Sequence, residues 1–275
     1  MSDIYHETAH IPVRPVIPSG EQEVMALYGG LVESERLLYP GSAELAMVGE
    51  AALLEGLARA KDEGKDVAIV DGAFDVPHDN HTWYLREARR RAARRHFGEA
   101  FVEASSEEQR SMVASDEVIL IVTLDADAKI AQKKGFQPEK GNVARPVYSW
   151  DARANRIGGL MIPNGGGAYR PTLDLITVEG DPAHQGSMFE SHLQFGRTLA
   201  EYGLLGTWVI FDEHPAVVEA ARSYVGADTN DIVSVVPQQE ARFAIDKRSG
   251  EHWSSSAIIR GIVGSSVTPN VPLSS

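Results

Sequence analysis

Cysteine is absent from the 275-residue chain. This absence excludes disulfide bonds, a cysteine nucleophile and cysteine-ligated zinc. No uninterrupted apolar run reaches the ~20 residues that a membrane-spanning helix needs, and the opening MSDIYHETAH contains no signal-peptide core. Basic residues are few: 26 Lys and Arg against 39 Asp and Glu give a net charge of −13, which argues against broad binding to nucleic acid or to anionic membranes. We therefore expect a cytoplasmic protein that binds neither nucleic acid nor membrane.

Short apolar runs rich in β-branched residues alternate with helical patterns along most of the chain. The alternation predicts an α/β fold, a Rossmann-like open parallel sheet with helices on both faces. The expected strands are residues 67–70, 118–123, 173–178, 207–211 and 231–236, and the expected helices are a stretch after Thr82 and residues 125–134, 187–202 and 215–224.

Prolines and turn residues divide the rest of the chain. Residues 1–41 contain several prolines and are expected to form a lead-in segment, followed by an α/β domain over 42–263 and a tail over 264–275. A helix is expected to begin at a Ser42 cap and to run to Gly64. Residues 158–205 are set apart as an insertion that would be specific to a substrate.

The expected helix after Thr82 is dense in arginine. A run of arginines on one helix most often forms a solvated face, so we expect most of these side chains to be exposed. They are Arg86, Arg89, Arg90, Arg91, Arg94 and Arg95.

The strongest candidate functional residues lie in the segment VAIVDGAFDVPHDNHTWYLREAR. A buried strand ends at Asp71-Gly72, a turn follows, and His78 and His81 stand three residues apart as a helix begins. In an open parallel sheet, ligands bind beyond the carboxyl ends of the strands. The free N–H groups and the positive dipole end of the helix are suited to bind phosphate there, and both imidazoles reach the same bound group.

This segment resembles the signature G-x-F-D-x-x-H-x-G-H of the nucleotidylyltransferase superfamily. The matching residues are Gly72, Phe74, Asp75, His78 and His81, whereas Asn80 stands where the family has glycine. Asparagine tolerates a left-handed backbone better than most residues, so the turn is expected to survive. The resemblance implies that residues 72–75 (Gly72, Ala73, Phe74 and Asp75) bind the nucleotide.

Two further segments support the resemblance. DADAKIAQKKG followed by Arg145-Pro146 is similar to the family segment with a lysine–glycine pair and an arginine–proline step, which implies that Lys133 or Lys134 contacts phosphate and that Arg145 contacts substrate. EHWSSSAIIRGIV is similar to the family's late serine/threonine motif. The serines of this motif (Ser254, Ser255 and Ser256) would bind the triphosphate. This segment can be aligned with the family motif in two ways that differ by one residue. One alignment resembles cytidylyltransferases, and the other, which uses Arg260, resembles adenylyltransferases.

The resemblance implies an enzyme that moves a nucleoside monophosphate from a nucleoside triphosphate to a small phosphorylated acceptor and releases pyrophosphate. CMP transfer to a polyol, sugar or alkanol phosphate is favoured, with AMP transfer, including the nicotinamide-mononucleotide type, nearly level. His81 would act on the α-phosphate and His78 on the triphosphate, while a lysine and Arg260 neutralise charge. Mg²⁺ would accompany the triphosphate, with no metal held mainly by the protein. The resemblance also implies a homodimer.

Residues after two other strands border the same expected cleft. Asp212 follows one strand and is a candidate nucleotide contact, while Asp181 and His184 follow another and are candidates for recognising the acceptor. Two alternatives remain open at this point: a nucleotide-binding regulatory module without turnover, which Asn80 permits, and a hydrolase that uses His78 and His81 on a divalent metal.

Overall fold

Five parallel strands form the centre of the protein. The structure is a computed structural model that describes residues 11–15, 46–48, 50–76, 78–134, 145–164, 169–211, 215–226 and 231–237. The parallel strands lie in the order β7-β4-β3-β8-β9. A short antiparallel pair continues the sheet beyond β7, in the order β2-β1-β7. The bounds are β1 (Ile11–Pro15), β2 (Ala46–Val48), β3 (Asp66–Gly72), β4 (Val118–Asp125), β7 (Leu175–Glu179), β8 (Leu205–Phe211) and β9 (Val233–Val236).

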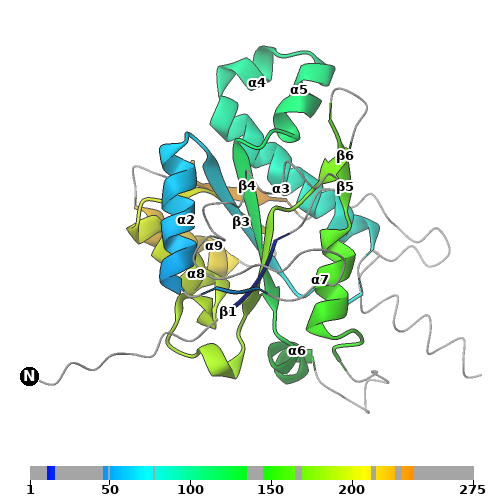
Figure 1. Ribbon diagram of the computed structural model, residues 1–275, viewed down its shortest axis with the longest axis vertical. Coiled ribbons are helices and arrows are strands. Elements are labelled where there is room, and N and C mark those ends of the chain that lie inside the picture. Colours follow the sequence, from blue (N-terminus) through cyan, green and yellow to red (C-terminus); the bar gives the residue numbers. More distant parts are fainter. Residues whose placement is uncertain are drawn as a thin grey trace, which may run out of the picture.

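Helices cover both faces of this sheet (Figure 1). One face carries α2 (Glu50–Asp62), α8 (His192–Glu201) and α9 (Pro215–Val225), and the other carries α3 (Asp79–Phe97) and α7 (Trp150–Gly158). The remaining elements are α4 (Glu99–Glu103), α5 (Ser106–Val113), α6 (Asp127–Lys134), the hairpin of β5 (Met161–Pro163) and β6 (Tyr169–Pro171), and the 3-10 turns η2 (Pro182–His184) and η3 (Met188–Glu190). Of the helices in the described part of the chain, none has both the length and the apolar character needed to cross a membrane.

The period of two along the strands explains the two-sided core. Val67 and Ile69 of β3 pack with the α2, α8 and α9 side chains, whereas Ala68 and Val70 pack with those of α3 and α7. All eight residues of β4 are buried, as expected for a parallel strand covered on both faces. The structure thus confirms the predicted α/β, Rossmann-like arrangement.

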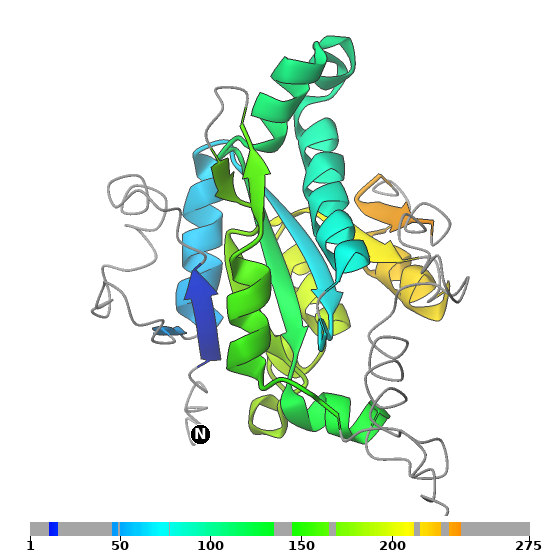
Figure 2. The same ribbon diagram turned by 90° about the vertical axis from the view of Figure 1, so that its right-hand side faces the viewer.

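The strand order places the ligand edge of the sheet. In chain order the five parallel strands are arranged 3-2-1-4-5, so the direction of winding reverses between β3 and β8. In open α/β sheets ligands bind at the carboxyl ends of the strands beside such a reversal. Figure 2 shows the arrowhead of β3 beside the first turn of α3, so the turn that carries the signature lies at this point.

The structure differs from four expectations about how the chain is divided. Residues 11–15, expected in a lead-in segment, form β1, which pairs with β7 through Val13 and Thr177. Residues 46–48, expected inside a helix, form β2, and the helix begins only at Glu50. Residues 187–202, expected as one helix, form η3 and then α8. β1 and β2 are stabilised by pairing between distant segments, which local periodicity does not report. The supposed insertion at 158–205 contains β7, the partner of β4.

A buried ion pair joins α3 to the sheet, and it corrects the expectation of exposure for one of the arginines. Arg89 is fully buried, and its Nη1 lies 2.5 Å from Asp174 Oδ2. The guanidinium also donates to the carbonyls of Val113, Ser115, Val118 and Thr172. The second Asp174 oxygen accepts from Arg170 at 2.6 Å. Because every donor of Arg89 finds an acceptor, the charge is tolerated inside the core.

We predict that Asp174→Asn lowers the free energy of unfolding by about 3–5 kcal/mol, because it leaves Arg89 as an uncompensated buried charge. Urea unfolding followed by circular dichroism measures the loss. Glu201→Gln is the matched control: it breaks the exposed Arg197–Glu201 pair and is expected to leave the midpoint unchanged. Equal effects of the two variants would contradict the importance of burial at Asp174.

Candidate functional site

The turn after β3 has a strained backbone that depends on a glycine. Phe74 has φ of 43°, in the left-handed region that non-glycine residues rarely adopt. Its buried ring lies over Gly72, where an added Cβ would come within 2.6 Å of a ring carbon. Gly72 therefore makes room for Phe74. Strain of this kind is concentrated at functional sites.

The two histidines of the signature lie together at the start of α3. The rings of His78 and His81 stack with centroids 3.8 Å apart, and Phe74 meets His81 edge-on at 5.0 Å. His78 is the N-cap residue, and its side chain makes no capping hydrogen bond. Asn80 lies in the first turn of the regular helix and has no positive φ. The position therefore does not require glycine, and asparagine introduces no strain there.

His81 is held neutral by its surroundings. Burial, followed by the charges of His78 and Lys134, lowers the pKa of His81 well below its usual value of 6.5. Loss of solvation and the neighbouring Arg145 likewise lower the pKa of Lys134. These couplings place Lys134 and Arg145 within electrostatic reach of the signature turn. Of the two candidate lysines, Lys134 is the one coupled to His81.

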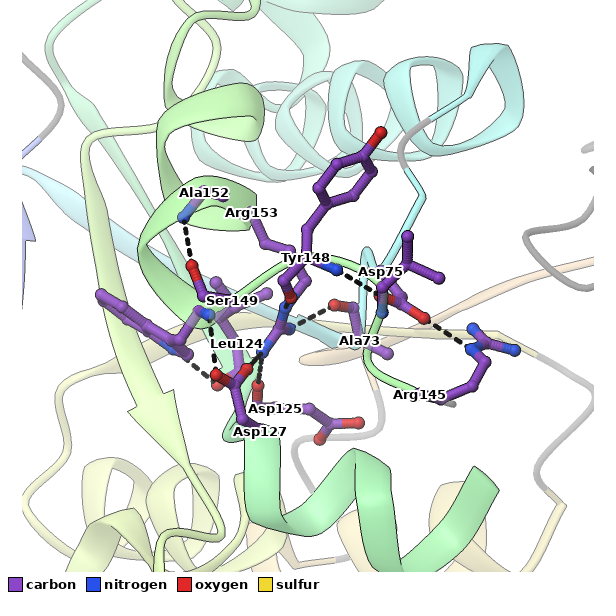
Figure 3. A network of polar contacts seen from close by, with 12 residues as sticks. Ala73, Asp75, Leu124, Asp125, Asp127, Arg145, Tyr148, Ser149, Ala152 and Arg153 are labelled. Carbon is purple, nitrogen blue, oxygen red and sulfur yellow. Dashed lines mark hydrogen bonds and ion pairs between the residues drawn. The ribbon is translucent and has the colours of Figure 1, made fainter. Parts of the chain in front are cut away.

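Asp75 is fully buried and organises the loop that enters α7 (Figure 3). One oxygen accepts from Arg145 Nε at 2.5 Å, and the other accepts from the backbone N–H groups of Val147 and Tyr148 at 2.7 and 3.3 Å. The side chain of Arg145 is itself only 7% exposed. Asp75 and Arg145, expected as nucleotide and substrate contacts, thus bind each other and join the two loops.

Arg153 is a site residue that the sequence analysis missed. Its side chain is fully buried, and Figure 3 shows it between the turn, the end of β4 and the loop before α7. Its guanidinium donates to the carbonyl of Ala73 at 2.5 Å, to the carbonyls of Asp125 and Tyr148, and to the carboxylate of Asp127. A sequence signal did exist: Arg153 lies beside Ala154 and one turn before Ile157, which are both buried.

The other predicted site residues have no direct contact with the signature turn, or lie outside the described residues. Lys133 lies at the end of α6 and is exposed, as is Lys134. Asp181 caps η2 by accepting from the N–H of Ala183, and His184 is buried within the same loop. Within the described residues, neither side chain forms a hydrogen bond or an ion pair with the signature turn. The remaining candidates lie outside the described residues; they are Asp212, Ser254, Ser255, Ser256 and Arg260.

A second polar cluster, which the sequence analysis also missed, lies at the same edge of the sheet. We call it the acidic cluster: Asp71, Asp125 and Glu179 from the ends of β3, β4 and β7, with Lys129 of α6 and His192 of α8. Burial alone raises the pKa of Glu179, but the hydrogen bond from His192 and the charge of Lys129 outweigh it and lower that pKa to about 2. The register of β4 and β7 places Asp125 opposite Glu179. The two residues are far apart in the sequence, so no local sequence pattern indicates that they are neighbours.

Comparison with models of known protein families finds no match, and comparison with curated proteins finds none either.

We predict that Arg153→Lys lowers the free energy of unfolding by at least about 2 kcal/mol, because lysine cannot reproduce the forked hydrogen bonds of a buried guanidinium. Amide hydrogen exchange should show faster opening of residues 73–76 and of the loop at 147–148. Thermal unfolding and exchange mass spectrometry measure the two effects. Arg156→Lys, on the exposed face of the same helix over the Tyr148 ring, should leave both unchanged. If residues 73–76 exchange at the same rate in Arg153→Lys as in the wild type, Arg153 does not hold the turn in place.

We predict a contribution of His81 to the pH dependence of stability. Since its pKa is lower in the folded protein than in the unfolded chain, the unfolded chain takes up the proton first as the pH falls below about 6.5. The contribution is therefore full above that pH and is lost on acidification. Unfolding free energies at a series of pH values should fall less steeply below pH ~6.5 in His81→Gln than in the wild type. His96→Gln, at the exposed His96–Glu117 pair, is the control, and parallel curves for wild type and His81→Gln would contradict the prediction.

Proposed function

We propose that this protein is a nucleotidylyltransferase. It would transfer a nucleoside monophosphate from a nucleoside triphosphate to a small phosphorylated acceptor and release pyrophosphate. The observation that carries the proposal is the position of the signature turn. The turn from Gly72 to His81 lies at the carboxyl end of β3, beside the reversal of strand order, where ligands bind in this class of fold.

The start of α3 supports binding of phosphate. α3 has 19 residues, and the side chain of its N-cap residue His78 makes no capping hydrogen bond, while the N–H of His81 donates to the His78 carbonyl at 2.9 Å. The N–H groups at the start of the helix and the positive end of the helix dipole attract an anion. The two imidazoles lie at the same helix end, and Lys134 lies within electrostatic reach. The α- and β-phosphates are the groups that we assign to this position.

The reaction requires charge stabilisation and no covalent intermediate. A phosphate oxygen of the acceptor attacks the α-phosphorus, the bond to the β-phosphate oxygen breaks, and pyrophosphate leaves with the electron pair. Negative charge grows on the α-phosphoryl oxygens and on the leaving group, so oriented donors lower the barrier. A neutral His81 can donate one N–H to the α-phosphate, while Lys134 supplies positive charge.

Mg²⁺ belongs to the substrate in this scheme. Both carboxylate oxygens of Asp75 already accept hydrogen bonds from Arg145, Val147 and Tyr148, so we do not assign Asp75 to the ion. Magnesium would enter with the triphosphate and keep phosphate oxygens and water as ligands, which suits its coordination chemistry.

The base and the acceptor depend on residues outside the described part. CMP transfer to a polyol, sugar or alkanol phosphate remains our first choice, and AMP transfer is the alternative, because the two alignments around Ser254–Ser256 and Arg260 differ in this respect. A silent nucleotide-binding module is less favoured than the sequence suggested, because Asn80 fits the helix without strain. A metal hydrolase at His78 and His81 is less favoured too: in the described residues no third carboxylate or imidazole completes a metal site with them.

The proposed function predicts pyrophosphate release with MgCTP or MgATP when a phosphorylated acceptor is supplied. His81→Ala should lower kcat by about 10²–10³, the usual loss when one charge-stabilising donor is removed, with KM for the nucleotide changed much less. A coupled pyrophosphate assay over a panel of polyol, sugar and alkanol phosphates measures this. His96→Ala is the histidine control.

The lysine pair offers a matched comparison in the same assay. Lys134→Met should lose most activity and Lys133→Met little, because only Lys134 is coupled to His81. If His81→Ala keeps half of the wild-type rate, the histidine is not part of the mechanism. If no acceptor supports turnover although nucleotide binds tightly in calorimetry, the protein is a binding module.

A further inference from the structure

The acidic cluster contains more ligand atoms than its own hydrogen bonds use. Lys129 Nζ lies 2.5 Å from Asp125 Oδ1 and also contacts Glu179 Oε1. His192 Nδ1 lies 3.4 Å from Glu179 Oε1 and 3.6 Å from Asp71 Oδ2. The side chain of Glu179 is 1% exposed, yet its Oε2 accepts no hydrogen bond within the described residues, and His192 Nε2 has no partner there either. Buried polar atoms are nearly always satisfied, so this carboxylate oxygen is a ligand atom that a cation can use.

The geometry and chemistry of three of these residues suit a metal ion. One ligand atom each from Asp71, Glu179 and His192 lies within 4.8 Å of the other two, so all three can face one ion, and they would have to move inward to reach metal–ligand distances of roughly 2.0–2.2 Å. Two carboxylates and an imidazole form a mixed oxygen and nitrogen set, which suits Zn²⁺ and similar first-row ions and does not suit Mg²⁺. The Asp71 side chain is 28% exposed, so the group is accessible from solvent.

The charges of the acidic cluster are compatible with a divalent ion. Without an ion, Asp71 and Glu179 raise the pKa of His192 despite its burial, so an imidazolium offsets part of the negative charge. With the neutral imidazole that metal binding requires, the three carboxylates and the single ammonium of Lys129 leave two negative charges at the ends of β3, β4 and β7. A net charge of this size is costly in a poorly solvated place unless it is paired. One divalent ion neutralises the acidic cluster completely. Lys129 would then remain with Asp125 while the ion takes the free side of Glu179.

We propose that Asp71, Glu179 and His192 bind one divalent transition-metal ion of the Zn²⁺ type. The ion joins the end of β3 to the end of β7 and the start of α8. Asp71 directly precedes Gly72, so the ion also restrains the strand end from which the signature turn begins. This site is separate from the magnesium that would accompany a triphosphate, and it does not depend on the proposed function.

The test is metal binding by the full chain without nucleotide. Protein stripped with a chelator and dialysed is titrated with Zn²⁺, Mn²⁺ and Mg²⁺ by calorimetry, and Co²⁺ binding is followed by its visible absorption. We expect one Zn²⁺ per chain, much weaker Mg²⁺ binding, a Co²⁺ absorption band and a rise in Tm with Zn²⁺. Glu179→Gln and His192→Asn should each weaken Zn²⁺ binding by more than about 100-fold, since loss of a direct ligand exceeds the effect of losing an outer-shell partner.

His96→Asn is the matched control, because His96 and Glu117 form an exposed imidazole–carboxylate pair at 3.1 Å; its affinity for Zn²⁺ should equal that of the wild type. Lys129→Met removes a positive charge beside the ion and should tighten binding. Absence of stoichiometric binding to the folded wild type overturns the proposal, whatever the variants do. Undiminished binding in a folded His192→Asn, or binding only in Lys129→Met, also overturns it and shows that the native acidic cluster is neutralised by its own ammonium and imidazolium.

Discussion

The buried guanidinium of Arg153 is the constraint on which the candidate site depends. The described residues between β3 and α3, which are 73–76 and His78, lie outside helices and strands, and Phe74 has a left-handed backbone. Such strain persists only where the surroundings leave the chain no alternative. Arg153 binds the carbonyl of Ala73, and Asp75 receives three hydrogen bonds from the loop before α7. The start of α3, with its two histidines, is positioned by these bonds.

Two regions of opposite character meet at one edge of the sheet. The signature turn has His78, His81 and the nearby Lys134, which suit an anion, whereas the acidic cluster has an excess of carboxylates, which suits a cation. They are adjacent because Asp71 and Gly72 are consecutive in β3 and because parallel strands end at the same edge. Lys134 is coupled to both Asp125 and Arg145, so the two regions influence each other electrostatically. An α/β sheet can therefore place anion-binding and cation-binding groups side by side.

Local patterns predicted the elements whose hydrophobic pattern can be recognised within a few consecutive residues. The five parallel strands are apolar runs, of which β4 and β7 are buried along their whole length. Their alternation with helices indicated the Rossmann-like class. The signature turn was found because glycine, aspartate and two histidines are close in sequence. The patterns failed at Ile11–Pro15 and Ala46–Val48, because those strands form by pairing with each other and with β7. The patterns also failed at Arg89 and Arg153, since an arginine has the same local signature whether it is solvated or surrounded by carbonyls.

The sequence by itself determined the fold class, the strand–turn–helix segment at residues 67–97 and the chemical types of its side chains, because periodicity and turn residues act over a few positions. Only the tertiary structure decided that Asp75 faces Arg145, that Gly72 makes room for Phe74, and that Asp71, Glu179 and His192 come together. The contact of Asp75 with Arg145 and the approach of Asp71 to Glu179 and His192 join residues about 70 to 120 positions apart, and the order of parallel strands, which sets them, is a property of the packed sheet as a whole. The contact of Gly72 with Phe74 is local, but it depends on the left-handed backbone of Phe74.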